Sequence, residues 1–212
     1  VRTQSIEVGV IVDRVREVLD VPEDDVELPP DIGIDTTYLL GMAKVAWETR
    51  DVDGAITLAN AGNDFGGAVT LTGGATQIAD KNALTLGTLA TGDLTATSAG
   101  QLDLGQGTVG GNLVASSGGL GPVVQTGPLT VTGTSDLNAG GLGVLLTNTG
   151  NDFQGTVKVV GIGVQLADKN AIALGTGSVG LLEVTADGAI TQSGALVVGV
   201  STQLTAKLRK QP

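Results

Sequence analysis

The chain has no Cys and no His among its 212 residues, which excludes several kinds of site. Without these residues it has no disulfide framework, no zinc site built from the usual ligands and no His-based catalytic triad. Aromatic residues make up only 2% of the chain, too few for a broad core built on rings. Proline is also scarce, so the 34 glycines do not indicate a Pro/Gly-rich disordered tract.

Basic residues are few, and the net charge is −11. Between residues 52 and 206 the only cations are Lys81, Lys158 and Lys169. Because phosphate binding needs clustered Lys and Arg, we expect no nucleic-acid partner and no attraction to an anionic membrane surface. No apolar run is long enough for a membrane-spanning helix, so we expect no membrane insertion.

An internal repeat dominates the rest of the sequence. Asn-Asp-Phe at 63–65 returns 88 residues later at 151–153, and Ala-Asp-Lys-Asn-Ala at 79–83 returns at 167–171 with the same offset. Two matches in register indicate stacked copies of one structural unit. We assign structural roles in the repeat to Asn63, Asp64, Phe65, Asp80, Asn82, Asn151, Asp152, Phe153, Asp168 and Asn170.

A shorter period is visible within the repeat. Gln-Thr-Gly-Pro-Leu at 125–129 is matched by Gln-Ser-Gly-Ala-Leu at 192–196, and other echoes fit coils of ~20 residues. The 88-residue unit would then hold four coils. Short runs such as 55–58 and 129–132 alternate apolar and polar residues, as strands with one buried face do. We therefore predict an all-β solenoid over 51–206, followed by a basic tail at 207–212.

Residues 52–206 resemble the filamentous haemagglutinin-type repeats of large secreted bacterial adhesins. The resemblance is carried by Leu-Ala-Asn-Ala-Gly-Asn-Asp-Phe-Gly-Gly at 58–67 and by Gly-Ala-Ile-Thr-Gln-Ser-Gly-Ala-Leu at 188–196. It implies a right-handed parallel β-helix that is exported through a partner pore in an outer membrane. It also implies a location outside the cell or on the surface of a Gram-negative bacterium.

The first fifty residues have a different character. The Val-rich run at 8–19, the proline pair at 29–30 and Gly-Met-Ala-Lys at 41–44 resemble the later part of the CheW family of chemotaxis coupling proteins. The resemblance covers residues 5–45 and implies a small, partial SH3-like β segment within residues 1–50. The family's first half, with its Asn-Leu-Arg-Gly motif, is absent. Trp47, next to the repeats, is a candidate cap for the open end of the solenoid.

Two patterns suggest chemistry and are better explained by structure. Residues 105–110 and 175–180 both satisfy G-x-G-x-x-G, but a dinucleotide site needs that loop to open a helix, and here strand-like runs follow. The repeated aspartates recur because whole coils recur, whereas a catalytic carboxylate pair has no reason to be duplicated. We expect them to form turns and caps, and we expect Phe65 and Phe153 to pack inside or along the coil.

The sequence thus predicts a protein with no catalytic residues, no cofactor and no metal. Its expected role is that of a β-helical stalk and contact segment of a secreted adhesin, with a protein or glycan surface as partner. The alternative is a cytoplasmic CheW-like adaptor fragment that couples a chemotaxis receptor to its histidine kinase. A polysaccharide-processing β-helix is a minor third hypothesis.

Overall fold

The computed structural model describes residues 26–27, 42–43 and 54–207, and in these residues it contains strands and no helix. The chain divides into two compact units, Val1–Arg50 and Asp51–Pro212. In the first unit, β1 (Val26–Glu27) pairs antiparallel with β2 (Met42–Ala43). The rest of the expected SH3-like segment, the candidate cap Trp47 and residues 208–212 of the basic tail lie outside the described residues.

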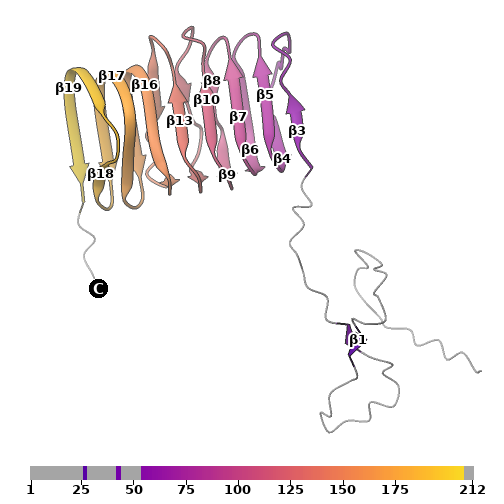
Figure 1. Ribbon diagram of the computed structural model, residues 1–212. Helices are drawn as coiled ribbons and strands as arrows, with labels where there is room; N and C mark the ends of the chain where they lie inside the picture. Colours follow the sequence, from indigo (N-terminus) through magenta and orange to yellow (C-terminus); the bar gives the residue numbers. More distant parts are fainter. Residues whose placement is uncertain (1–25, 28–41, 44–53, 208–212) are drawn as a thin grey trace, which may run out of the picture. The chain divides into compact units, whose positions relative to one another are not determined.

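The second unit is a parallel β-solenoid with three faces (Figure 1). Face 1 begins with five strands, β3 (Ile56–Leu58), β5 (Thr76–Asp80), β7 (Leu94–Ser98), β10 (Leu113–Ser116) and β13 (Ser135–Asn138). Face 2 includes β8 (Leu102–Asp103), β11 (Val123–Val124) and β14 (Gly143–Leu146). Face 3 includes β4 (Val69–Gly73), β9 (Gln106–Val109), β12 (Leu129–Val131) and β15 (Asp152–Phe153).

Longer strands run through the corners between faces. β6 (Leu84–Thr91) passes from face 2 to face 3, and β16 (Thr156–Asp168) passes from face 1 to face 2. β17 (Ile172–Ala186) stacks on β16, and β19 (Leu196–Ala206) stacks on β17, so both also pass from face 1 to face 2. β18 (Ile190–Gln192) precedes β19 in the chain and pairs with the first residues of β17. The predicted parallel solenoid is confirmed, and its strands stack coil upon coil in a single direction.

The strand register measures the length of each coil. On face 1, Thr76 pairs with Leu94, Leu94 with Leu113, Leu113 with Ser135, and Ser135 with Val157. These steps are 18, 19, 22 and 22 residues long, close to the expected ~20. Four coils from Thr76 therefore take 81 residues.

The expectation that the 88-residue repeat holds four coils is wrong, because the repeat is 7 residues longer than four coils. The residue 88 positions after Thr76 is Val164. Val164 pairs with Val144 on face 2, whereas Thr76 lies on face 1. The repeat unit thus equals four coils plus one face. Equivalent residues of the two copies consequently lie at different corners of the solenoid.

A continuous aliphatic core runs along the solenoid. Alternation along the strands is clear in β5, where Thr76, Ile78 and Asp80 are buried and Gln77 is exposed. The largest fully buried side chains are Phe153, Ile78, Leu84, Leu86, Leu94, Leu102, Leu104, Leu113, Leu129, Leu137, Leu146 and Ile172. Each coil is too thin to bury these side chains alone, so the core exists only because neighbouring coils cover one another.

Candidate functional site

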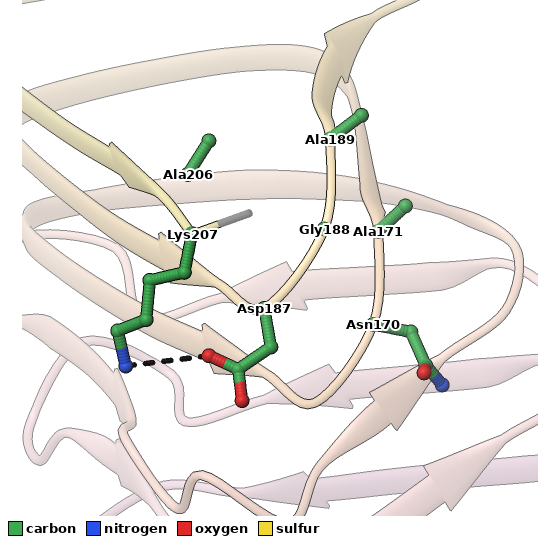
Figure 2. A pocket seen from close by; sticks show the side chains of 7 residues that line it. All are labelled: Asn170, Ala171, Asp187, Gly188, Ala189, Ala206 and Lys207. Atoms are coloured by element: carbon green, nitrogen blue, oxygen red, sulfur yellow. Dashed lines mark ion pairs between the residues drawn. The ribbon is translucent and has the colours of Figure 1, made fainter. Parts of the chain in front are cut away.

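A surface hollow of about 470 Å³ lies at the C-terminal end of the solenoid (Figure 2). It is lined largely by small residues such as Gly188, Ala189 and Ala206, beside an ion pair of 3.3 Å between Lys207 Nζ and Asp187 Oδ1. Both charged side chains are about half exposed, so the pair adds at most ~1 kcal/mol of stability. The lining thus consists mostly of small side chains and one exposed ion pair.

The first copy of the repeated motif forms a corner between faces 1 and 2. Its turn is set by Asn60, whose Oδ1 accepts the N–H of Gly62 at 2.8 Å and whose carbonyl accepts the N–H of Asn63 at 3.1 Å. Asn63 Nδ2 then donates to the carbonyl of Leu58 at 2.8 Å. These short-range bonds fold residues 58–63 into a compact turn, as Asn side chains commonly do.

The next coil is fastened to this turn by Asp80 and its neighbours. Asp80 Oδ2 accepts the N–H of Phe65 at 2.7 Å, and Asp80 Oδ1 accepts the N–H of Asn82 at 2.6 Å. Asn82 Nδ2 donates to Asp64 Oδ1 at 3.0 Å, and Lys81 Nζ lies 2.8 Å from Asp64 Oδ2. The residues conserved between the two copies therefore join one coil to the next.

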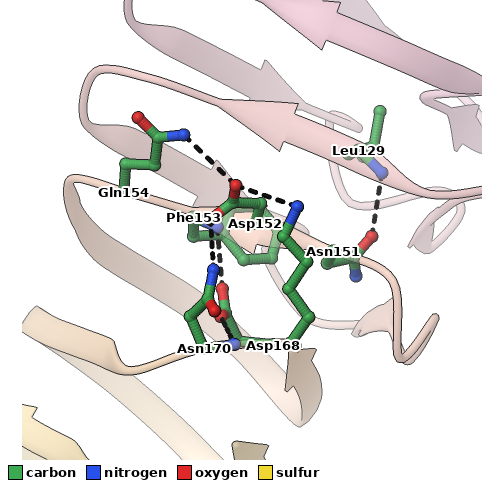
Figure 3. A network of polar contacts seen from close by, with 8 residues as sticks. Leu129, Asn151, Asp152, Phe153, Gln154, Asp168 and Asn170 are labelled. Atoms are coloured by element: carbon green, nitrogen blue, oxygen red, sulfur yellow. Dashed lines mark hydrogen bonds and ion pairs between the residues drawn. The ribbon is translucent and has the colours of Figure 1, made fainter. Parts of the chain in front are cut away.

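The second copy builds the same network at the corner between faces 2 and 3 (Figure 3). Asp168 Oδ2 accepts the N–H of Phe153 at 2.7 Å, and Asp168 Oδ1 accepts the N–H of Asn170 at 2.6 Å. Asn170 Nδ2 donates to Asp152 Oδ1 at 3.1 Å, and Lys169 Nζ lies 3.1 Å from Asp152 Oδ2. Sequence reasoning placed the aspartates and asparagines in the motif but gave no role to the two lysines inside Ala-Asp-Lys-Asn-Ala.

The electrostatics of the carboxylates follow their surroundings. The Lys81 ammonium lowers the pKa of Asp64, and Asp64 in turn raises the pKa of Lys81. Burial acts to raise the pKa of Asp152, but hydrogen bonds from Lys169, Gln154 and Asn170 outweigh it and the pKa is lowered. For Asp168 burial prevails over the two backbone hydrogen bonds, and its pKa is raised.

The two copies differ in what lies on the other side of the turn. Asn151 is fully buried, and its Oδ1 accepts the N–H of Leu129 at 3.0 Å and Gln125 Nε2 at 2.8 Å. Its Nδ2 donates to Gln125 Oε1 at 2.8 Å. Both partners belong to the preceding coil, so Asn151 joins its own coil to the one before it. Asn63 belongs to the first described coil and is only half-buried.

Gln125 and Leu129 were recognised in the sequence only as part of a short echo, without a role. Gln125 Nε2 also donates to the carbonyl of Gly127, which closes a tight turn. The echo at 192–196 closes the same turn, because Gln192 Nε2 donates to the carbonyl of Gly194 at 2.6 Å. The signal that could have identified this contact is the presence of a Gln-x-Gly-x-Leu turn one coil before Asn151.

The two glycine hexapeptides lie in strands. Residues 106–109 form β9, which pairs with β12, and residues 175–180 lie within β17. Gly107 has φ +125°, and a Cβ there would collide with the backbone of Leu89 in the preceding coil. These glycines let neighbouring coils approach closely, whereas a dinucleotide loop would have to open a helix.

The described residues contain no cluster of three His, Cys, Asp or Glu side chains that could hold a metal ion. Within the described residues, no helix is long and apolar enough to cross a membrane.

The two phenylalanines of the motif lie at or near the core. Phe153 lies in the core. Phe65 is half-buried and packs against the core near its own coil. The motif residues therefore form hydrogen-bonded corners and core contacts between coils.

Comparison with known families adds one result. The profile of a family described as repeats of unknown function (DUF5649) matches residues 41–72, 91–160 and 161–208, well over half of the chain. The chain belongs to this repeat family. No curated protein and no solved structure matches the chain. The matched segments include both copies of the corner network, apart from the Asp80–Asn82 part of the first.

Proposed function

We propose that this repeat protein is a non-enzymatic stalk and contact segment of a secreted or surface-attached bacterial adhesin. The observation that carries the proposal is the stacking itself, with eight successive strand levels on face 1 between β3 and β19 joined by continuous parallel pairing. A core shared by every coil resists bending, because a bend would separate strands that are hydrogen-bonded along the whole length. Such a rod is suited to hold a binding surface away from a cell.

Face 3 offers the best contact surface for this role. Thr72, Ala90, Thr108, Thr130 and Asp152 follow one another in register along its outer side. Of the three threonines, Thr72 and Thr108 are exposed and Thr130 is half-buried. Adjacent parallel strands are ~4.8 Å apart, so Thr108 and Thr130 present neighbouring hydroxyl groups, while Ala90 lies between Thr108 and Thr72. Hydroxyl groups along one face of a sheet can bond to the hydroxyl and amide groups of a glycan or an extended protein.

The alternating side chains allow this surface to be tested without disturbing the core. We would label the full chain with a fluorophore and measure its binding to an array of glycans and extracellular-matrix proteins. The test variant replaces Thr72, Thr108 and Thr130 by Val, which keeps the β-branched shape and removes the hydroxyl groups. The matched control replaces Thr57, Thr95 and Thr97 on face 1 by Val.

We expect the parent chain and the face 1 control to bind the same array members, and the face 3 variant to lose at least tenfold in affinity, as loss of a few hydrogen bonds would cause. Equal binding by both variants would exclude face 3 as the contact surface. Absence of binding by the parent chain to any glycan or matrix protein would argue against the contact role. Release of reducing sugars from an array glycan would instead support the polysaccharide-processing hypothesis.

A further inference from the structure

A second surface hollow, of about 390 Å³, lies on the outer side of face 2, where β14, β16, β17 and β19 are paired side by side. Leu145, Gly163, Gln165, Leu181 and Glu183 are among its lining residues, and we call it the face 2 hollow. We propose that the face 2 hollow binds an extended peptide that carries an aliphatic side chain and, two residues away, a lysine or arginine. This contact surface is separate from face 3, and the proposal does not depend on the role of face 3.

A missing side chain creates the hollow. On the outer side of face 2, Gly143, Gly163 and Leu181 follow one another in register. A Cβ at Gly163 would meet no atom within 4 Å, whereas most other glycines of the solenoid have an atom of a neighbouring residue within that distance. The space above Gly163 faces outward, so the stacking of coils, which buries the inward side chains, does not fill it.

Two leucines border this space. Leu181 pairs with Gly163 in the following coil, and Leu145 pairs with Gln165 from the preceding coil. Leu145 is 38% exposed and Leu181 is 46% exposed. Because removal of aliphatic surface from water is favourable, these leucines favour an aliphatic side chain placed over Gly163.

The polar part of the hollow lies two residues farther along the same strands. Gln165 Nε2 donates to Glu183 Oε2 at 2.9 Å, and both side chains are exposed. Among the described residues that line the hollow, Glu183 alone is charged. No Lys or Arg of the described chain forms an ion pair with it, so its charge is available to a cation from outside.

The charge of the solenoid selects a basic partner. Residues 54–207 contain nine acidic and four basic side chains. Three of these four, Lys81, Lys169 and Lys207, already form ion pairs with aspartates. Glu183 would repel an acidic peptide at close range, whereas it would attract Lys or Arg.

The spacing of the two parts fits an extended chain. Gly163 and Gln165 are two residues apart in β16, so they face the same side of the sheet and lie ~6.6 Å apart. In an extended peptide, side chains two residues apart also face one side at this spacing. A peptide that lies along β16 can therefore place an aliphatic side chain over Gly163 and a basic side chain beside Glu183 at the same time.

Peptide binding to the full chain tests the proposal. The probes are fluorescent heptapeptides that carry one Leu and one Lys in a Ser-Gly background, in both orders and at every separation, and binding is measured by fluorescence polarisation. We expect the tightest binding at a separation of two residues in one of the two orders. Replacement of Lys by Gln should weaken binding about threefold, because an exposed ion pair contributes up to ~1 kcal/mol. Binding that does not depend on the separation, or no binding at all, would overturn the proposal.

Gly163→Val tests the aliphatic part of the hollow. The variant fills the open space and should weaken the binding of the best Leu-Lys peptide by at least about tenfold, as the loss of a buried aliphatic contact would. Gly67→Val is the matched control, because a Cβ there also meets no atom within 4 Å, and it should bind like the parent chain. Unchanged binding by Gly163→Val would place the peptide elsewhere and contradict the proposal.

Glu183→Gln tests the charged part. It keeps a side-chain oxygen that can accept from Gln165 and removes only the charge. The variant should bind the Lys peptide about threefold more weakly and the Gln peptide like the parent chain. An equal loss for both peptides would show that Glu183 does not recognise the cation.

The same variants separate this proposal from the role of face 3. The face 3 threonine variant should bind the Leu-Lys peptide like the parent chain, and Gly163→Val should keep the parent's binding to the glycan and matrix array. Loss of peptide binding in the face 3 variant would contradict the face 2 hollow as its site.

Discussion

The side chain of Asn151 accepts a hydrogen bond from the backbone N–H of Leu129, 22 residues earlier and one coil before it, at 3.0 Å. Through Asp152 and Phe153, the same turn is bonded to the following coil at Asn170 and Asp168. A single short turn thus holds three consecutive coils together. The stability of the solenoid should therefore be unusually sensitive to these few polar residues.

Asn151→Ala should destabilise the solenoid strongly. Asn151 is fully buried, and the substitution leaves the N–H of Leu129 without its acceptor and Oε1 of Gln125 without the donor Asn151 Nδ2. Unsatisfied buried groups cost about 1–3 kcal/mol each, so we expect a loss of about 2–4 kcal/mol in urea unfolding. Asn63→Ala is the matched variant and should lose less than ~1 kcal/mol, since Asn63 is only half-buried and, within the described residues, its side chain bonds to the carbonyl of Leu58 in its own coil. Equal losses would contradict the role of the contact with Leu129.

Removal of the two phenylalanines should have unequal effects. Phe153 is 2% exposed and lies inside the core, so Phe153→Ala should lower the free energy of unfolding by about 3–5 kcal/mol. Phe65 is half-buried, and Phe65→Ala should cost less because solvent can occupy part of the space. Thermal and urea unfolding of both variants would check the order. A larger loss for Phe65→Ala would contradict the half-buried position of Phe65.

The pH dependence should differ between Asp152 and Asp168. The pKa of Asp152 is lowered in the folded state, so its contribution to stability is present above the unfolded pKa, near 3.8, and is lost as the pH falls through the folded pKa. Burial raises the pKa of Asp168 in the folded state. Ionisation of Asp168 therefore opposes folding, and stability is lost as the pH rises from the unfolded pKa through the folded pKa of this group. Carboxyl ¹³C NMR titration should find the two pKa values on opposite sides of 3.8.

Asp152→Asn provides the matching stability experiment. This variant cannot lose the Asp152 contribution at low pH, so its stability should fall less steeply than that of the parent chain below pH ~4. Gln101→Ala, an exposed position in a middle coil with no ionisable group, is the control and should keep the parent slope. If Asp152→Asn kept the parent slope as well, the pKa of Asp152 would not be depressed in the folded chain.

Gly107→Ala should be severely destabilising. Gly107 has φ +125°, and its added methyl group would meet the carbonyl oxygen of Leu89 in the adjacent coil. Two costs then add, left-handed backbone strain of about 1–2 kcal/mol and a forced separation of strands. Gly163→Ala is the control, because a Cβ there meets nothing within 4 Å. Comparable melting temperatures for the two variants would show that the coils can separate without loss of stability.

The chemotaxis prediction depends on residues 5–45, of which the structure describes only 26–27 and 42–43. In these residues β1 and β2 form a short antiparallel pair, with Val26 opposite Ala43 and Glu27 opposite Met42. A pull-down with a chemotaxis histidine kinase checks this alternative, and we expect no specific retention of the full chain. Stoichiometric retention would favour the coupling role over the adhesin.

The sequence alone determined the fold class, because alternation of apolar residues is local and the repeat at 63–65 and 151–153 needs no structure to be seen. It also grouped the right residues into the motif, since Asp80 and Asn82 recur with Asp64 at one offset. Only the tertiary structure decided which corner each copy occupies. That choice depends on coil lengths of 18 to 22 residues, which are set by pairing between strands far apart in the chain. Val164 therefore lies on face 2 although its repeat partner Thr76 lies on face 1.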